Sequence, residues 1–433
     1  MHKIKKLKNG LTIIEAPVSG THAVTFLCLV PVGSRYEHKK ISGVSHFVEH
    51  LMFKGTAKRP TSLDISRELD AAGAQFNAFT DKDRTGYWIK IDAAHQEKAV
   101  DILSDMIFNS KFDADDIKRE KGVIVEEIRM YDDNPRAAVE LMFDRVMYGN
   151  HPLGWDIAGS VKGIKAMSRA DLWNYYKDAY APGNMVVVAA GKVNANTHRL
   201  IKKYFGRAPK RSLKITKEKF VKFVRAKHSS KTNRVDAEKR KMDQSQVIIG
   251  YPGLKIGDPR RYALSVMLNI LGGGMSSRLF TEVREKRGLA YSVRAEAAVY
   301  RDTGAVCVMA GLDPKRLREA VSVINKECER MAKERVTEKE LKDAKNNLAG
   351  HLALAMEDSS AQASWYAGKF WFEKKLIDWA AEIKNLQKVT INDVKKIAAE
   401  IFKLSERRAA VVSPINKKSV IKILKFTPLN KIN

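Results

Sequence analysis

Short apolar runs alternate with longer amphipathic stretches along the first half of the chain. Runs rich in aliphatic and β-branched residues predict strands at 11–15, 23–30 and 184–191, and a hairpin at 74–81 and 85–91. Charged and aliphatic residues at helical spacing predict helices at 61–69, 95–110, 113–131 and 135–148, and a helix followed by a turn at 168–183. The pattern therefore predicts a mixed chain in which helices and strands both contribute to the core.

The second half repeats this pattern weakly. Residues 245–250 correspond to the strand near 24–26, residues 302–306 resemble 84–88, and residues 390–413 resemble 168–191. These offsets are all about 220 residues, which favours a duplication over two unrelated domains.

A basic segment separates the two halves. Residues 207–241 hold fourteen Lys and Arg against three Asp and Glu and have few apolar clusters, so we interpret them as a linker. The predicted organisation is a first domain at 1–206, this linker, and a second domain at 242–433.

Composition is that of a globular protein with room for two or more domains. The chain has 433 residues, of which 44% are hydrophobic and 30% are charged. The basic amino terminus is not followed by an apolar segment, and no apolar run is long enough to span a bilayer, so neither a signal peptide nor a membrane span is expected. Cys28, Cys307 and Cys328 are far apart in the sequence and fit reduced thiols in a cytoplasmic protein.

The formal net charge of +28 allows several interpretations. A basic surface could attract acidic peptides or nucleic acid. The chain has no basic motif interleaved with aromatic residues and no zinc-finger spacing, so no nucleic-acid partner is expected. We favour the interpretation that the charge reflects the general composition of the source proteome.

The clearest chemical signal lies at residues 45–53, a short predicted helix between turns. His46, Glu49 and His50 are spaced at i, i+3 and i+4, which places their side chains on one helical face. Two imidazoles one turn apart can bind one metal ion, and a carboxylate beside them can hold a metal-bound water. The order His-x-x-Glu-His is that of the inverted zinc-peptidase signature. The alternative is two histidines on an ordinary amphipathic helix.

A catalytic zinc needs a third protein ligand, and an acidic predicted helix follows at 115–130. Glu120 and Glu127 are two turns apart on one face, whereas Glu126 points about 100° away from Glu127. Acidic residues on a charged helix are usually solvated, so the residues alone leave the third ligand open.

A glycine-rich stretch at 271–280 precedes a further predicted helix. A glycine-rich loop before a helix can bind phosphate. The lysine-serine pair of a P-loop and the GxGxxG spacing are both missing, so nucleotide binding is not favoured. Arg284 and Tyr291, seven residues apart, follow this stretch; the ordinary alternative for Tyr291 is a core tyrosine.

Taken in order, these motifs resemble the M16, or pitrilysin-type, metallopeptidases, the group that contains pitrilysin, insulin-degrading enzyme and the mitochondrial processing peptidases. The resemblance covers nearly the whole chain and is closest in length to the small bacterial members. One departure is Trp155, which stands after His151-Pro152-Leu153-Gly154 where the family usually has a basic residue.

The resemblance implies roles for individual residues. It implies one Zn²⁺ per chain, held by His46, His50 and Glu127, with Glu126 the neighbour that could be confused with the third ligand. It implies that Glu49 is the general base and that Glu120 supports the ligands. Substrate contacts are implied for an exposed edge strand containing Asn77, Ala78 and Phe79, and for Arg284 and Tyr291.

The resemblance also implies an α+β fold of two homologous domains, each a mainly antiparallel sheet covered by helices, forming half of a clam shell. The second half lacks the histidines and should carry no metal. The implied function is endopeptidase cleavage of short or unfolded polypeptides, by a homodimer or by a heterodimer with a paralogue. The alternatives are a non-catalytic subunit of a peptidase-like scaffold and a zinc hydrolase of another class.

Overall fold

The computed structural model describes residues 2–210, 220–224, 234–374, 376 and 378–424. These residues form two compact units, each assembled from three separate stretches of chain. Unit 1 comprises residues 1–129, 155–221 and 353–377, and unit 2 comprises residues 130–154, 222–352 and 378–433.

Unit 1 is built on a six-stranded sheet with the order β1-β2-β6-β3-β5-β4. Its strands are β1 (Lys3–Lys6), β2 (Thr12–Pro17), β3 (Ala23–Val30), β4 (Gln75–Thr80), β5 (Thr85–Asp92) and β6 (Val186–Gly191). Its helices are α1 (Val44–Leu51), α2 (Ser62–Asp70), α3 (Gln96–Asn109), most of α4 (Ala114–Asp133), α6 (Val161–Ala166), α7 (Arg169–Ala179), α8 (Ala195–Phe205) and α13 (Ser359–Gly368).

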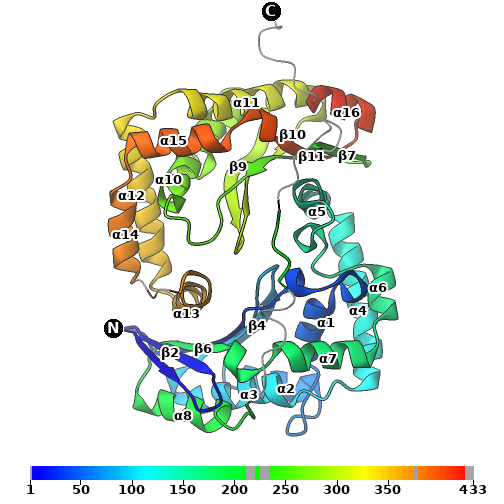
Figure 1. Ribbon diagram of the computed structural model, residues 1–433, viewed down its shortest axis with the longest axis vertical. Coiled ribbons are helices and arrows are strands. Elements are labelled where there is room, and N and C mark those ends of the chain that lie inside the picture. Colours follow the sequence, from blue (N-terminus) through cyan, green and yellow to red (C-terminus); the bar gives the residue numbers. More distant parts are fainter. Residues whose placement is uncertain (1, 211–219, 225–233, 375, 377, 425–433) are drawn as a thin grey trace, which may run out of the picture. The chain divides into compact units, whose positions relative to one another are not determined.

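Both faces of the central strands of this sheet are buried, because strand β3 is apolar on both faces except at Thr25. Phe26 and Cys28 pack into the large core beneath α1, α3 and α7. Leu27 and Leu29 point to the opposite face, where they join Tyr366 and its neighbours on α13. Figure 1 shows the sheet between these two helical layers.

Unit 2 is built on a five-stranded sheet with the order β7-β11-β8-β10-β9. Its strands are β7 (Val235–Lys239), β8 (Ser245–Pro252), β9 (Ala290–Val299), β10 (Gly304–Leu312) and β11 (Arg408–Ser413). Its helices are α5 (Pro135–Tyr148), α10 (Arg261–Gly272), α11 (Leu317–Lys333), α12 (Glu338–Ala355, of which the last residues belong to unit 1), α14 (Trp379–Gln387), α15 (Ile391–Ile401) and α16 (Lys417–Leu424).

The two sheets share one topology, which supports the duplication. Each sheet contains one parallel pair, which joins a strand from the start of its half of the chain to the last strand of that half: β2 with β6 in unit 1, and β7 with β11 in unit 2. All the other pairings are antiparallel in both sheets, and β1 is the additional edge strand of unit 1. Helix α10 takes the place of α1 and contains no histidine.

Each half of the chain gives one helix to the other half's sheet. Helix α5, from the first half, packs on β8 and β11 of unit 2, and α13, from the second half, packs on β3 and β6 of unit 1. The packing of α5 is tight: a Cβ on Gly250 of β8 would lie 2.3 Å from the ring of Phe143 on α5. Each sheet therefore depends on a helix that lies far away in the sequence.

The predicted fold class is confirmed: each unit is a mainly antiparallel sheet covered by helices. Strand β7 lies inside the segment 207–241 that we interpreted as a linker. It was not predicted, because the charged residues in its sequence, Val-Asp-Ala-Glu-Lys, gave no strand signal. Residues 211–219 and 225–233 of that segment lie outside the described residues. The domain boundaries 1–206 and 242–433 remain a proposal about the duplicated halves.

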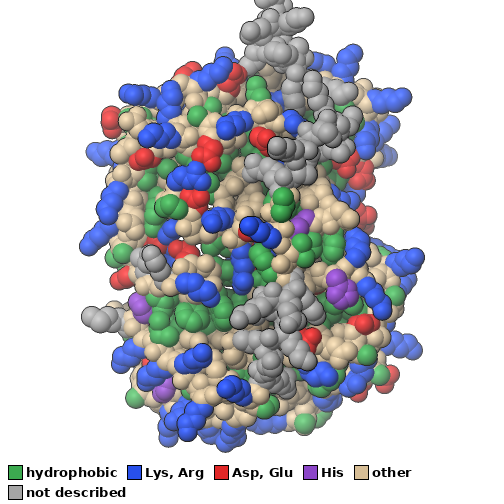
Figure 2. Space-filling view, in the orientation of Figure 1, with side chains coloured by type: hydrophobic (Ala, Val, Ile, Leu, Met, Phe, Trp, Pro, Cys, Tyr) green, Lys and Arg blue, Asp and Glu red, His purple; other side chains and the backbone are tan. Residues whose placement is uncertain are grey.

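Two surface properties bear on partners. None of the helices in the described ranges has the length and apolar character needed to cross a membrane. Figure 2 shows Lys and Arg side chains spread over the whole visible face, with no single basic patch.

Candidate metal centre

Helix α1 begins at a glycine and is capped by a buried carboxylate. Gly43, just before the helix, has a φ of 98°, a conformation that strongly favours glycine. Glu37 accepts hydrogen bonds from the backbone N–H groups of Gly43 at 2.7 Å and Ser45 at 2.8 Å. These bonds satisfy N–H groups that the first turn of a helix leaves free, so Glu37 fixes the start of α1.

The two faces of α1 differ in character. Phe47, Val48 and Leu51 are buried in the core of unit 1, which fixes the rotation of the helix about its axis. The side chains of His46 and His50 lie on another face and keep 12% and 20% of their surface exposed. The helix therefore presents both imidazoles at the edge of the core, where they are partly exposed to solvent.

Helix α4 presents its carboxylates to α1. Glu120 is buried on the same stripe as Ile117 and Ile124, and the helix continues through Gly122 without a break. Glu127, one heptad beyond Glu120, faces the histidines, whereas the side chain of Glu126 is 68% exposed and pairs with Arg129. The geometry thus distinguishes Glu127 from Glu126, which the residues alone left open.

Three potential metal donors converge between the helices. Nε2 of His50 lies 3.3 Å from Nε2 of His46 and 3.3 Å from a carboxylate oxygen of Glu127, and His46 Nε2 lies 3.5 Å from the other oxygen. In a tetrahedral zinc site with bonds of about 2.0–2.1 Å, ligand atoms are separated by about 3.3–3.4 Å. Two imidazoles and one carboxylate at these separations fit a zinc ion with a fourth position left open.

The close contacts among His46, His50, Glu120 and Glu127 shift the pKa values of His50 and Glu127. Burial would lower the pKa of His50, but hydrogen bonds to Glu120 and Glu127 outweigh it and raise the pKa to about 9. The same contacts with His46 and His50 hold the pKa of Glu127 well below its usual range. A metal ion must therefore displace a proton from this cluster, as is general for imidazole ligands.

Glu49 lies one residue before His50 and is held from the edge strand of the sheet. The hydroxyl of Thr80, the last residue of β4, donates a hydrogen bond to the Glu49 carboxylate at 2.5 Å. Burial raises the pKa of Glu49, while the Thr80 bond and the two histidines oppose this shift. A half-buried carboxylate beside a metal position can accept a proton from a water bound there.

A second layer of contacts holds the ligands. One carboxylate oxygen of Glu120 lies 3.1 Å from Nδ1 of His50, and the other accepts a hydrogen bond from Lys54 at 2.8 Å. Burial opposes ionisation of Glu120, but its bonds with His50 and Lys54 outweigh this and lower its pKa.

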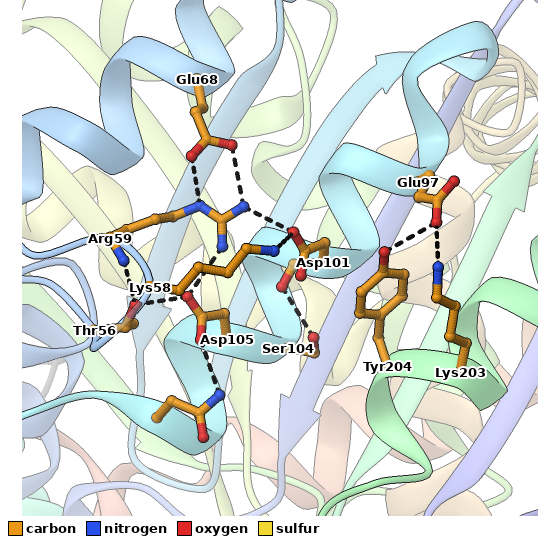
Figure 3. A network of polar contacts seen from close by, with 11 residues as sticks. Thr56, Lys58, Arg59, Glu68, Glu97, Asp101, Ser104, Asp105, Lys203 and Tyr204 are labelled. Atoms are coloured by element: carbon orange, nitrogen blue, oxygen red, sulfur yellow. Dashed lines mark hydrogen bonds and ion pairs between the residues drawn. The ribbon is translucent and has the colours of Figure 1, made fainter.

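The loop after α1 is fixed by a buried arginine, seen in Figure 3. Arg59, whose side chain is 3% exposed, contacts Glu68, Asp101 and Asp105 at 2.8–3.1 Å. Thr56 donates to Asp105 at 2.6 Å and so ties the loop to α3. This network holds the loop that follows Lys54 against α2 and α3.

Strand β4 has an open edge beside Glu49. Among the described strands it pairs with β5 alone, and the amide N–H of Ala78 is bonded by the side chain of Asn77 at 2.8 Å. Phe79 lies on the opposite face of the sheet from Thr80, with its ring over Gly86 of β5. An edge strand of this kind can pair with an added peptide through the main-chain groups that have no partner in the sheet.

Arg284 and Tyr291 lie together in unit 2. The Arg284 guanidinium lies 5.1 Å from the centre of the Tyr291 ring and 4.7 Å from that of Phe280. Tyr291, on the edge strand β9, is 76% exposed, so it is not a core tyrosine. The two side chains contact each other and both are exposed to solvent.

Sequence reasoning missed Thr80, Lys54 and Glu37 as partners of the site. Lys54 had a signal, because His46, His50 and Lys54 are each four residues apart. Glu37 and Thr80 had none, since their contacts depend on how a loop and a strand lie against α1. The departure Trp155 is held locally, with Lys39 over its ring at 4.7 Å and Lys82 bonded to its carbonyl at 2.5 Å.

Two family models match the chain. Residues 14–160 match "Insulinase (Peptidase family M16)" and residues 166–348 match "Peptidase M16 inactive domain". The match of the first model contains both histidines and all the carboxylates discussed above.

Curated bacterial relatives align over most of their length. The chain is 32% identical to the uncharacterized zinc protease YmxG of Bacillus subtilis, over 94% of this chain and 97% of that protein. It is 35% identical to an uncharacterized zinc protease of Mycobacterium tuberculosis, over 95% of this chain and 93% of that protein.

Solved structures share the fold. A protease from Helicobacter pylori has a TM-score of 0.88 at 24% identity, over 96% of this chain and 99% of that one. A putative M16-like peptidase from Alicyclobacillus acidocaldarius has a TM-score of 0.83 at 21% identity, over 95% and 98%.

Proposed function

Because this chain belongs to peptidase family M16, we propose that it is a zinc-dependent endopeptidase that hydrolyses short or unfolded polypeptides. The observation that carries the proposal is the convergence of His46, His50 and Glu127, whose donor atoms all lie within 4.8 Å of one another. The adjacent carboxylate of Glu49 supplies the group that a hydrolase needs besides a metal.

In this proposal one zinc ion per chain is held by Nε2 of each histidine and by the Glu127 carboxylate. When bound, zinc acts as a Lewis acid that lowers the pKa of a water ligand and polarises a carbonyl. Glu49 takes a proton from the attacking water at its carboxylate and delivers it to the nitrogen of the leaving amine. The Thr80 hydroxyl donates a hydrogen bond to the Glu49 carboxylate and so restrains its orientation.

Glu120 has a supporting role in the proposal. With Nε2 of His50 used for the metal, Nδ1 carries the proton and its N–H donates a hydrogen bond to Glu120, at the observed 3.1 Å. This bond fixes both the tautomer and the ring orientation of His50. Glu120 is therefore required for the geometry of the site and does not itself exchange protons with the substrate.

We propose that a substrate peptide adds to the free edge of β4 at Asn77, Ala78 and Phe79. Main-chain hydrogen bonds to an edge strand tolerate many side chains, which suits cleavage of unfolded polypeptides. Arg284 and Tyr291 are proposed to hold substrate carbonyls, because a guanidinium and a phenol can donate to a carbonyl or to an oxyanion.

The proposed active form is a cytoplasmic homodimer, with a heterodimer of this chain and a paralogue as the alternative. Cys28, Cys307 and Cys328 are all free and buried, which fits a reducing compartment. A test is the rate of peptide cleavage per chain across a dilution series that crosses the dimer dissociation range.

The experiment that tests the function is zinc analysis of the purified protein together with cleavage of an internally quenched, unstructured peptide. Zinc at one ion per chain and cleavage that a chelator abolishes and added zinc restores are expected. Zinc without cleavage of any unstructured peptide would favour the alternative, a non-catalytic or partner-dependent subunit. Cleavage that survives complete removal of metal would contradict the proposed chemistry.

A further inference from the structure

Helices α1 and α4 face each other with an alternating ladder of charges. His46, His50 and Lys54 are spaced four residues apart along one stripe of α1 and the turn after it, and Glu127 and Glu120 are spaced seven apart on α4. Read along the helices, Glu127 contacts both histidines at 3.3–3.5 Å, Glu120 contacts His50 at 3.1 Å, and Lys54 contacts Glu120 at 2.8 Å. Lys54 is therefore the terminal cation of the ladder.

Glu120 needs this cation because it is almost fully removed from water. Its side chain is 6% exposed, and its two oxygens have different partners, His50 on one and Lys54 on the other. A buried carboxylate that loses one charged partner turns toward water or toward another donor. Such a rotation moves the acceptor that fixes Nδ1 of His50.

Charge balance leads to the same residue. Glu49, Glu120 and Glu127 bring three negative charges to the cluster, and a divalent ion supplies two positive charges. Across the described part of the chain, Lys54 is the one lysine or arginine whose ion pair with these three carboxylates is seen. It supplies the third positive charge.

We propose that Lys54 is a positioning residue of the metal centre, which holds the Glu120 carboxylate in the orientation in which it fixes Nδ1 of His50, so that His50 presents Nε2 to the metal. The inference rests on the proposed function for the identity of the metal but concerns binding and not cleavage. The direction of the change in metal affinity on removing Lys54 distinguishes this role from simple charge repulsion. Simple repulsion between an ammonium and a divalent cation predicts that removing Lys54 tightens metal binding, whereas positioning through Glu120 predicts that it weakens it.

The test is the zinc dissociation constant, measured by competition with a chromophoric chelator at fixed pH and low ionic strength. Lys54→Met keeps the length of the side chain and removes its charge, and is expected to weaken zinc binding about tenfold. Lys54→Arg is expected to restore most of the affinity. Lys58→Met is the matched control, because Lys58 lies four residues further on, is 57% exposed and pairs with Asp101 outside the cluster; it should leave the constant unchanged.

A double variant tests the route through Glu120. Glu120→Gln alone should weaken zinc binding, and adding Lys54→Met to it should cause no further loss. Unchanged or tighter binding in Lys54→Met, an equal loss in Lys58→Met, or a full additional loss in the double variant would each overturn the inference. A wild-type protein that binds zinc but cleaves no peptide would refute the proposed function and leave this inference standing.

Discussion

Thr80 donates a hydrogen bond to Glu49 at 2.5 Å, so the last residue of the free edge strand holds the proposed general base. The contact joins the surface where we place the substrate to the group that we assign to proton transfer. Replacing Thr80 by Val keeps the shape and removes the donor, and kcat/KM should fall about tenfold, the value of one hydrogen bond to a charged group. Thr80→Ser should keep most of the activity, and zinc content should be unchanged in both. Full activity in Thr80→Val together with a loss in Thr80→Ser would show that the methyl group, and not the hydroxyl, is needed.

Glu49→Gln should bind zinc as well as the wild type and lose cleavage by about 10²–10⁴-fold, the usual contribution of a general base. The measurement is kcat on an unstructured peptide with zinc content determined on the same sample. A zinc-loaded Glu49→Gln protein that still cleaves would rule out the proposed role.

Glu127→Gln and Glu126→Gln form a matched pair of adjacent, identical changes. Glu127 faces both histidines, so its amide variant should lose most of its zinc and its activity. Glu126 pairs with Arg129 at the surface, so its variant should keep both. Zinc analysis after dialysis distinguishes the two, and loss of zinc in Glu126→Gln would overturn the ligand assignment.

Glu37 predicts a pH dependence of stability. Burial raises its pKa from 4.5 to about 7, although bonds from Ser45 and Gly43 oppose the shift. The pKa of Glu37 is higher in the folded state than in the unfolded state. Its contribution to the free energy of unfolding is therefore complete below pH 4.5 and is lost as the pH rises through 7, a decrease of about 3 kcal/mol. In metal-free protein, the thermal midpoint of Glu37→Gln should therefore rise relative to that of the wild type between pH 5 and pH 8. A constant difference across that range would contradict the prediction.

Arg59 should be the most sensitive position in the loop after α1. Its buried guanidinium contacts three carboxylates, and removing one partner of a buried ion pair costs about 3–5 kcal/mol. Arg59→Met should lower the thermal midpoint of the protein, and Arg59→Lys should restore little, because a lysine cannot reproduce the planar fork. Lys58→Met, at the exposed edge of the same network, is the control and should change the midpoint by little.

Local spacing accounts for what could be predicted from the sequence. His46, Glu49 and His50 lie within about one turn, so their shared face follows from helix geometry alone. Helix geometry also shows that Glu126 and Glu127 point in different directions, but not which of them faces the histidines. Lys54 continues the same spacing and could have been found.

Contacts that depend on long-range packing could not be predicted. Glu37 reaches the start of α1 from a short loop, and Thr80 reaches Glu49 from the edge of the sheet. The sheet assignments of α5 and α13 also carry no local signal, since an amphipathic helix does not specify which apolar face will cover it. Strand β7 was missed because charged residues dominate its sequence.

The exchange of α5 and α13 has a consequence for biosynthesis. On the ribosome, the strands that surround the metal ligands emerge early, but the helix that covers the other face of their sheet lies at Ser359–Gly368. Until that helix has been translated, Leu27, Leu29 and their apolar neighbours remain exposed to solvent. The metal-bearing unit therefore cannot finish folding as an independent amino-terminal domain, and a nascent chain stalled before residue 359 should be a substrate for chaperones and proteases.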